Sequence, residues 1–314
     1  MSTDGDADRA SQTGASRARA DEEHTGVVES PSPGAGAPPG GGGGETPTRT
    51  PADAPGSDSG HTGLPAGPPV WHDVYEVSSY WADMTGHAYP HGILEMLQDS
   101  AWRHAEALGL GYSHLDRESL LWVLSRLDVH ITRMPKWGET VRLETWPTGT
   151  HRLFALREFC LYDDDERELL RANSAWLVID GENRKPRKPG PVVERRRIPT
   201  NPGNYDAAPP KVEPPTAANA AGYELTARYS DLDAQRHVNN ARYVEWMLNG
   251  LPDDWMDTHT PRELSVNFLR ECGLADAVRI VCDHHADAGR ERTLHSVLLD
   301  DTPVCVMTAV WASR

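Results

Sequence analysis

The chain follows the same plan twice, and this repetition constrains its fold more than any other feature. In the first pass, apolar residues recur at helical spacing from residue 89 to residue 109, where a glycine ends the run. Stretches rich in β-forming residues follow, and turn-forming clusters separate them. We therefore expect one helix and then four strands, at 120–133, 139–146, 152–162 and 169–180.

The second pass repeats this order after a strand-like stretch at 223–230. A shorter helical stripe covers 241–251, and strands are expected at 263–272, 277–285, 292–300 and 303–313. The two passes also align in detail, because Arg133 and Arg142 have the same spacing as Arg270 and Arg279. We predict an internal duplication; the alternative is two unrelated α+β pieces.

The repeated unit also indicates how the halves associate. A single helix followed by antiparallel strands favours a sheet that wraps around the helix, and each unit alone would leave a sheet edge unpaired. Two units can pair edge to edge, as the subunits of a symmetric dimer do. The expected fold class is therefore α+β, with the two halves joined into one continuous sheet.

Composition separates these halves from the rest of the chain. Residues 1–68 contain a glycine-rich run and no aromatic residue, so we expect a disordered low-complexity tail. Proline and alanine dominate the stretch between the halves, which we interpret as a linker. The predicted boundaries are a first half at 69–198, a linker at 199–221 and a second half at 222–314.

Charge and cysteine content exclude several classes of function. The formal net charge of −16 opposes binding to nucleic acid or to an anionic membrane surface, and no apolar run is long enough to span a membrane. The tail lacks the apolar core of a secretory signal and has too many acids for a transit peptide. The four cysteines fit neither a zinc site nor a disulfide framework, so we expect a cytoplasmic protein without metal or cofactor.

The stretch "SDLDAQRHVNNARYVEW" (230–246) gathers more polar residues at a helix start than capping requires. Asn239 and Asn240 are ordinary capping residues, and we also assign them to substrate binding. Asp233 taken alone would cap a turn, and Gln235 would face solvent. The excess of polar groups makes this stretch the candidate site.

The chain resembles the acyl-acyl-carrier-protein thioesterases, which have a tandem hot-dog fold. The blocks that carry this resemblance are 97–104, 120–146 and 171–180 in the first half, and 230–246 and 268–273 in the second. The resemblance implies hydrolysis of the thioester between a fatty acyl chain and the phosphopantetheine arm of acyl carrier protein. It implies five catalytic positions, which are Asp233, Gln235, His237, Glu271 and Cys272. Gln235 stands where the plant members have Asn.

Several mechanisms fit these residues. Asp233 or Glu271 could serve as general base for a water molecule, Asp233 could attack directly, and His237 could carry a proton. Cys272 with His237 could form a thiolate nucleophile. We favour water attack assisted by a carboxylate, because the adjacent Glu271 disfavours a Cys272 thiolate.

The halves differ in chemistry. By internal alignment, Met134 and Pro135 occupy the places of Glu271 and Cys272, so we predict one active site, in the second half. The family resemblance assigns the acyl chain to the first half, where Met96, Leu97 and Trp122 are candidate lining residues. The expected partner is acyl carrier protein, and the expected assembly is a monomer or homodimer. The alternatives are an acyl-CoA thioesterase, a non-catalytic acyl-binding module and a hot-dog dehydratase.

Overall fold

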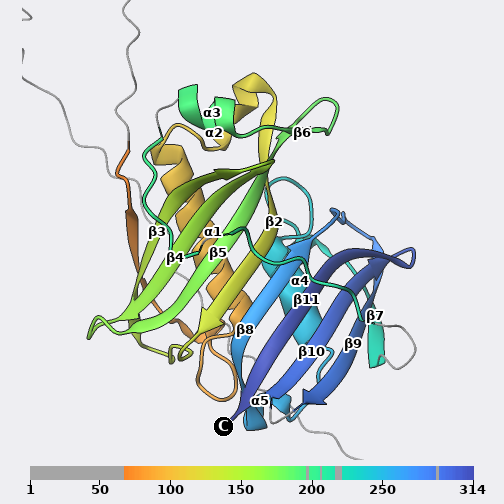
Figure 1. The fold of residues 1–314 in the computed structure, drawn as a ribbon. Helices are drawn as coiled ribbons and strands as arrows, with labels where there is room; N and C mark the ends of the chain where they lie inside the picture. Colours follow the sequence, from red (N-terminus) through yellow and green to blue (C-terminus); the bar gives the residue numbers. More distant parts are fainter. Residues whose placement is uncertain (1–66, 196–197, 206, 216–220, 288–289) are drawn as a thin grey trace, which may run out of the picture. The chain divides into compact units, whose positions relative to one another are not determined.

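A computed structural model describes residues 67–195, 198–205, 207–215, 221–287 and 290–314 (Figure 1). The predicted disordered tail, 1–68, lies outside the described residues except for Gly67 and Pro68. None of the helices in the described ranges is long and apolar enough to cross a membrane.

The first half contains the predicted long helix and four long strands. The helix is α1 (Pro90–Ala107), and the strands are β2 (Leu120–Ile131), β3 (Thr140–His151), β4 (Phe154–Asp163) and β5 (Glu168–Asp180). The sequence analysis missed the edge strand β1 (Trp71–Glu76) and the short elements α2 (Tyr112–Leu115), β6 (Pro186–Arg187) and α3 (Gly190–Arg195). Short 3₁₀ turns cover Ser79–Trp81 and Asp116–Glu118.

The second half repeats this order. It consists of β7 (Ala221–Thr226), α4 (Asn240–Leu248), α5 (Trp255–Thr258), β8 (His259–Phe268), β9 (Ala277–Asp287), β10 (Arg290–Leu299) and β11 (Thr302–Ser313). A 3₁₀ turn at Tyr229–Asp231 precedes α4. The prediction that the strand beginning near residue 263 extends to residue 272 is wrong, because β8 ends at Phe268. Glu271 and Cys272 therefore lie in the connection to β9 and not on a strand.

The strands of both halves form one antiparallel sheet, as predicted. In the described part of the chain the strand order is β1-β3-β4-β5-β2-β8-β11-β10-β9-β7, with the short β6 beside β5. The order reads the same from both ends when corresponding strands are exchanged. The halves join where β2 pairs with β8, with Leu127 opposite Val266. Edge-to-edge pairing of the two copies thus closes the edge that each would leave open.

The two long helices pack on one face of this sheet (Figure 1). Leu94 and Leu97 of α1 belong to the same buried cluster as Leu143 and Phe159 of the sheet. The helix α4 contributes Val244 and Met247, among others, to that cluster. Burial of these apolar faces is the main force that holds helix and sheet together.

The described part of the predicted linker runs across the sheet face opposite these helices (Figure 1). The buried amide of Asn173 donates to the carbonyl of Ala207 at 2.8 Å. Asn267 is also buried; its amide donates to the Pro210 carbonyl at 3.0 Å and accepts from the Val212 N–H at 2.8 Å. Buried side-chain amides therefore satisfy backbone groups of this segment, which would otherwise be left unpaired.

Candidate active site

The polar stretch before α4 folds into a tight turn that Asp233 holds together. One carboxylate oxygen of Asp233 accepts from the backbone N–H of Gln235 at 2.8 Å and of His237 at 3.4 Å. The Asp233 N–H in turn donates to the His237 carbonyl at 2.9 Å. An aspartate that bonds its own following backbone in this way stabilises a turn. The turn-forming interpretation of Asp233 therefore has a direct structural counterpart.

The first half builds the same turn before α1. The carboxylate of Asp83 accepts from the N–H groups of Thr85 at 2.8 Å and His87 at 3.1 Å. The Ala88 N–H donates to the Pro135 carbonyl at 2.8 Å. In the second half, the Val238 N–H donates to the Cys272 carbonyl at 2.9 Å. These matched bonds support the internal alignment, which sets Met134 and Pro135 against Glu271 and Cys272.

Glu271 is what distinguishes the second turn from the first. Its carboxylate lies 3.4 Å from Nε2 of His237, and each side chain is 36% exposed. The guanidinium of Arg184, from the β5–β6 connection, also pairs with this carboxylate. Glu271 is thus held between a histidine of the second half and an arginine of the first, and water can reach it.

Cys272 is adjacent in sequence but lies in the core. Its residue is 1% exposed, and its backbone N–H donates to the hydroxyl of Tyr243 at 3.0 Å. Burial raises the pKa of the Cys272 thiol above its usual range. A buried thiol with a raised pKa is a poor nucleophile at neutral pH.

The two asparagines at the start of α4 have different partners. Asn239 is the capping residue, and its side chain accepts from the Ala241 N–H at 2.9 Å. Asn240 faces the other half of the molecule, where its amide donates to the side-chain oxygen of Gln98 at 3.3 Å. This bond joins the start of α4 to the middle of α1.

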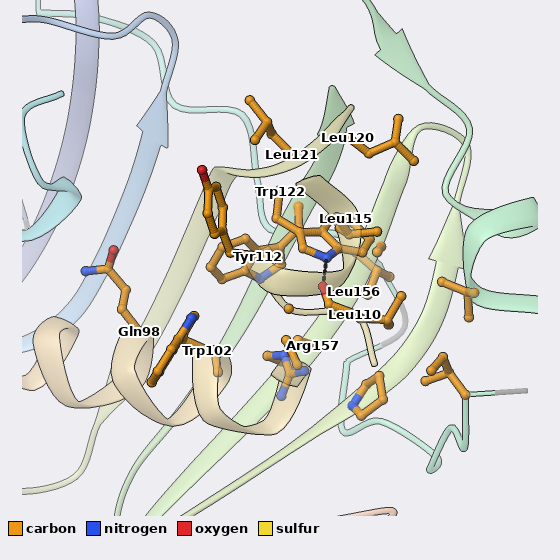
Figure 2. Close-up of a pocket in the computed structure, with 18 of the residues that line it drawn as sticks. Gln98, Trp102, Leu110, Tyr112, Leu115, Leu120, Leu121, Trp122, Leu156 and Arg157 are labelled. Atoms are coloured by element: carbon orange, nitrogen blue, oxygen red, sulfur yellow. Dashed lines mark hydrogen bonds between the residues drawn. The ribbon is translucent and has the colours of Figure 1, made fainter. Parts of the chain in front are cut away.

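A cavity of about 180 Å³ begins beside this contact and extends into the first half (Figure 2). Gln98 and Gln235 are among its lining residues. Most of the remaining lining is apolar and comes from α1, α2, β2 to β5 and the segment around α3. It includes Leu110, Leu115, Leu120, Leu121, Trp122, Leu156, Trp176, Val193 and Ile198. The polar turn and an apolar cavity therefore share a boundary at Gln235.

The three residues predicted to line the acyl cavity lie in three different places in the structure. Trp122 lines the cavity, and its Nε1 donates to the Leu110 carbonyl at 2.9 Å (Figure 2). Leu97 borders a smaller neighbouring void, and Met96 lies in the main core. The long strands and α1 were predicted, but α2 and the segment around α3 were not. Sequence analysis therefore missed Tyr112 and Val193, and it also missed Arg184.

No group of three or more histidine, cysteine, aspartate or glutamate side chains in the described ranges could hold a metal ion.

Comparison with known proteins identifies the family. Residues 68–191 match the model of the acyl-ACP thioesterase N-terminal domain, and residues 215–313 match that of the C-terminal domain. The chain belongs to the acyl-ACP thioesterase family. Its two hot-dog halves correspond to the two domains of that family.

Relatives of this acyl-ACP thioesterase family member include plant proteins. It is 29% identical over 220 residues to the chloroplastic acyl-[acyl-carrier-protein] hydrolase FATB2 of Cuphea viscosissima, covering 65% of this chain and 52% of the relative. It is 28% identical over 226 residues to oleoyl-acyl carrier protein thioesterase 1 of Arabidopsis thaliana, covering 66% and 62%. The chain thus spans about half to three fifths of the length of these relatives.

Solved structures show the same fold. An acyl-ACP thioesterase from Bacteroides thetaiotaomicron has a TM-score of 0.68 and 25% identity, covering 77% of this chain and 97% of the other. The 12:0-ACP thioesterase from Umbellularia californica has a TM-score of 0.71 and 22% identity, covering 78% and 94%. The second likeness concerns the fold alone.

Proposed function

We propose that this protein hydrolyses the thioester of a fatty acyl group on acyl carrier protein and releases the free fatty acid. The observation that carries this proposal is the position of the His237–Glu271 pair. The pair lies on the turn whose Gln235 lines an apolar cavity, and the equivalent turn of the first half has no acid in the place of Glu271. An apolar cavity suits an acyl chain, and a carboxylate–imidazole pair suits hydrolysis of the group at its head.

In the proposed reaction, Glu271 is the general base. It takes a proton from water, and the resulting hydroxide oxygen forms a bond to the thioester carbonyl carbon. The N-terminus of α4, with its partial positive charge, stabilises the developing oxyanion. The carbon–sulfur bond then breaks, and a protonated His237 delivers its proton to the leaving thiolate. Glu271, whose carboxylate lies 3.4 Å from the imidazole, passes the proton it took from water to His237 and so restores both groups.

The other family positions have supporting roles in this scheme. Asp233 shapes the turn that presents His237, as Asp83 does for His87. Gln235 lies where the cavity meets the turn. Its side chain is one methylene longer than the Asn of the plant members, and this length allows its amide to reach the acyl chain near the thioester. Asn240 connects this region to Gln98. Cys272 is a packing residue.

The charge around the pair favours acyl carrier protein over coenzyme A as the carrier. The carrier protein is acidic, and exposed Arg184, Lys185, Arg236 and Arg270 lie on the segments that contain or contact Glu271 and His237. The names of the plant relatives also specify acyl carrier protein. We assign binding of the acyl chain to residues 69–198 and catalysis to residues 222–314, with a linker at 199–221 between them. We expect the protein to be cytoplasmic and to be a monomer or a homodimer.

The test is release of free thiol from acyl carrier protein and coenzyme A thioesters of graded chain length. We expect turnover, faster with the carrier protein. Glu271→Gln should lower kcat by about 10² to 10⁴, the usual contribution of a general base. His237→Gln should lower it similarly, and the matched variant His87→Gln should stay near wild type.

Two outcomes would count against the proposal in different ways. Failure of the wild-type protein to release thiol from every thioester would refute the function. Activity that survives in Glu271→Gln and disappears in Cys272→Ala would leave the function intact and reverse the mechanism.

A further inference from the structure

The apolar cavity contains one buried cation, Arg157 of β4. The residue is 8% exposed, and its guanidinium lies among the cavity-lining groups, beside the C-terminal part of α1 (Figure 2). Burial lowers its pKa to about 10, so the group stays charged at neutral pH. A charge in such surroundings is costly unless it is paired.

The described residues do not supply the counter-ion. Arg157 forms no ion pair with any carboxylate of the described residues. The neighbouring Glu158 points to the opposite face of the sheet, as alternation along a strand requires. There its carboxylate accepts from the N–H groups of Asn204 at 2.7 Å and Tyr205 at 3.2 Å. The nearest acid in the sequence is therefore used elsewhere.

Instead, two neutral acceptors orient the guanidinium. Nη1 donates to Nδ1 of His104 and to the hydroxyl of Thr145, both at 3.0 Å. The roles of both acceptors are fixed, because Nε2 of His104 donates to the Pro68 carbonyl at 2.8 Å and the Thr145 hydroxyl donates to the Glu158 carbonyl at 2.9 Å. Arg157 is thus held in one orientation by two acceptors that are themselves fixed by other hydrogen bonds.

This network uses only part of the donor capacity of the arginine. A guanidinium has five N–H donors, and the two bonds described involve Nη1 alone. The donors on Nε and Nη2 have no acceptor among the described residues. They belong to a side chain that lines a cavity whose other groups are mainly hydrocarbon.

We propose that these donors of Arg157 form a subsite for an oxygen atom carried by the acyl chain. The preferred substrates would then be thioesters of oxygenated acyl groups, with a hydroxyl, keto or terminal carboxyl oxygen, and not of plain alkyl chains. The inference rests on the proposed function, since it takes the cavity to be the acyl site. A carboxylate would supply the missing counter-ion, and a hydroxyl or keto group would supply an acceptor.

The position of Arg157 places this oxygen far from the thioester. Gln98 lies beside the catalytic turn, and His104 follows it by six residues on α1. A helix rises about 1.5 Å per residue, so the two side chains are separated by about 9 Å along the axis. The subsite therefore recognises an oxygen in the middle or at the end of the chain.

Binding of free acids tests this subsite without any catalytic step. The wild-type protein is titrated calorimetrically with an alkanoic acid, its ω-hydroxy analogue and its α,ω-dicarboxylic analogue, at several matched chain lengths. A hydrogen bond to a charged group predicts that an oxygenated analogue binds at least about tenfold more tightly than its parent at one or more lengths. Equal affinities at every length, or no binding of any acid, would overturn the proposal.

Two variants connect the preference to the residue. Arg157→Met should abolish the advantage of the oxygenated acids, and Arg157→Lys should keep part of it for the dicarboxylic acid only, because lysine retains the charge without the planar fork. The control Arg126→Gln removes an arginine that bonds the Pro209 carbonyl and does not line the cavity, so the preference should persist. A preference that survives in Arg157→Met would also overturn the proposal.

The outcome is separable from the proposed function. If thioesters are hydrolysed and the acids bind equally, the subsite is refuted and the enzyme stands. If the oxygenated acids bind preferentially and no thioester is hydrolysed, the subsite stands as a binding site and the catalytic proposal fails.

Discussion

Glu271 and Cys272 are neighbours in the chain with opposite surroundings. Glu271 faces His237, Arg184 and solvent, whereas the Cys272 side chain packs in the core near Tyr243. One step along the backbone therefore changes the environment of the side chain completely. This difference separates the candidate base from the candidate nucleophile more clearly than their chemistry alone.

Cys272→Ala should therefore keep its activity and lose stability. We expect kcat/KM within about threefold of wild type, because a buried thiol with a raised pKa takes no part in the proposed reaction. Loss of a buried sulfur should lower the free energy of unfolding by about 1 to 2 kcal/mol. Initial rates and urea denaturation measure the two effects. A large loss of kcat without loss of stability would contradict this assignment.

At the scale of elements, the start of α4 divides two tasks between consecutive asparagines. Asn239 caps the helix, and Asn240 reaches across to Gln98 of α1. The cap satisfies an N–H that the helix itself cannot pair. The bond to Gln98 connects the start of α4 to a residue that lines the cavity.

The variants Asn239→Ala and Asn240→Ala should separate these tasks. Loss of the cap should lower the free energy of unfolding by about 1 kcal/mol. Loss of the bond to Gln98 should cost less stability and should raise KM more than it changes kcat, because it loosens the joint between cavity and turn. Urea denaturation and steady-state kinetics on the same preparations test both. Equal stability of the two variants would contradict the division.

The elements that could be predicted from sequence are those with strong local patterns. The long strands and α1 have clear periodicity, and capping by an asparagine was predicted although the choice between Asn239 and Asn240 was open. The sequence analysis places Glu271 on a strand because it interprets the whole stretch 263–272 as one strand. The structure ends that strand at Phe268, after which the N–H groups of Leu269 and Arg270 both donate to the Val304 carbonyl. Cys272 then bonds Tyr243 and Val238.

Contacts between distant residues were beyond such patterns. Arg184 reaches Glu271 across 87 positions of sequence, and Arg157 meets His104 across 53. From its local sequence, Arg184 is an ordinary charged residue of a turn, and Arg157 is an ordinary charged residue of a strand. Their roles depend on tertiary packing, which periodicity does not encode.

For the molecule as a whole, two buried histidines couple stability to pH. Burial lowers the pKa of His104 to about 4, with Arg157 adding to the effect, and lowers that of His295 to about 3. Both lie below the usual value of about 6.5 in an unfolded chain. At pH values between the folded-state and unfolded-state pKa of these histidines, the unfolded chain binds more protons than the folded one. The free energy of unfolding therefore falls as the pH falls.

We expect Tm to decrease as the pH is lowered from about 6.5 toward 4, the interval between the unfolded and folded values. His295→Asn removes one of the two groups and should make this decrease shallower, whatever its effect on Tm at neutral pH. Differential scanning calorimetry across this range gives both slopes. A variant slope equal to or steeper than that of the wild type would contradict the assignment to His295.

The segment between the halves makes a second prediction at this scale. Asn267→Leu leaves the Pro210 carbonyl and the Val212 N–H without their partner, which should cost about 1 to 3 kcal/mol for each group left buried. Limited proteolysis should then cut this segment faster. Lys211→Gln is the matched control, because among the described residues that exposed side chain pairs only with the nearby Glu213. Equal cutting rates in both variants would argue against anchoring by Asn267.

The seam between β2 and β8 has a genetic consequence. In a dimer of identical chains every substitution is inherited twice, so a change that improves one subunit as a container for substrate also alters the subunit that performs the reaction. Here the two copies are separate stretches of a single chain, so each can be substituted independently. Met134 could therefore stand where the other copy has Glu271, and Arg157 where the other has Thr293, without either copy constraining its twin.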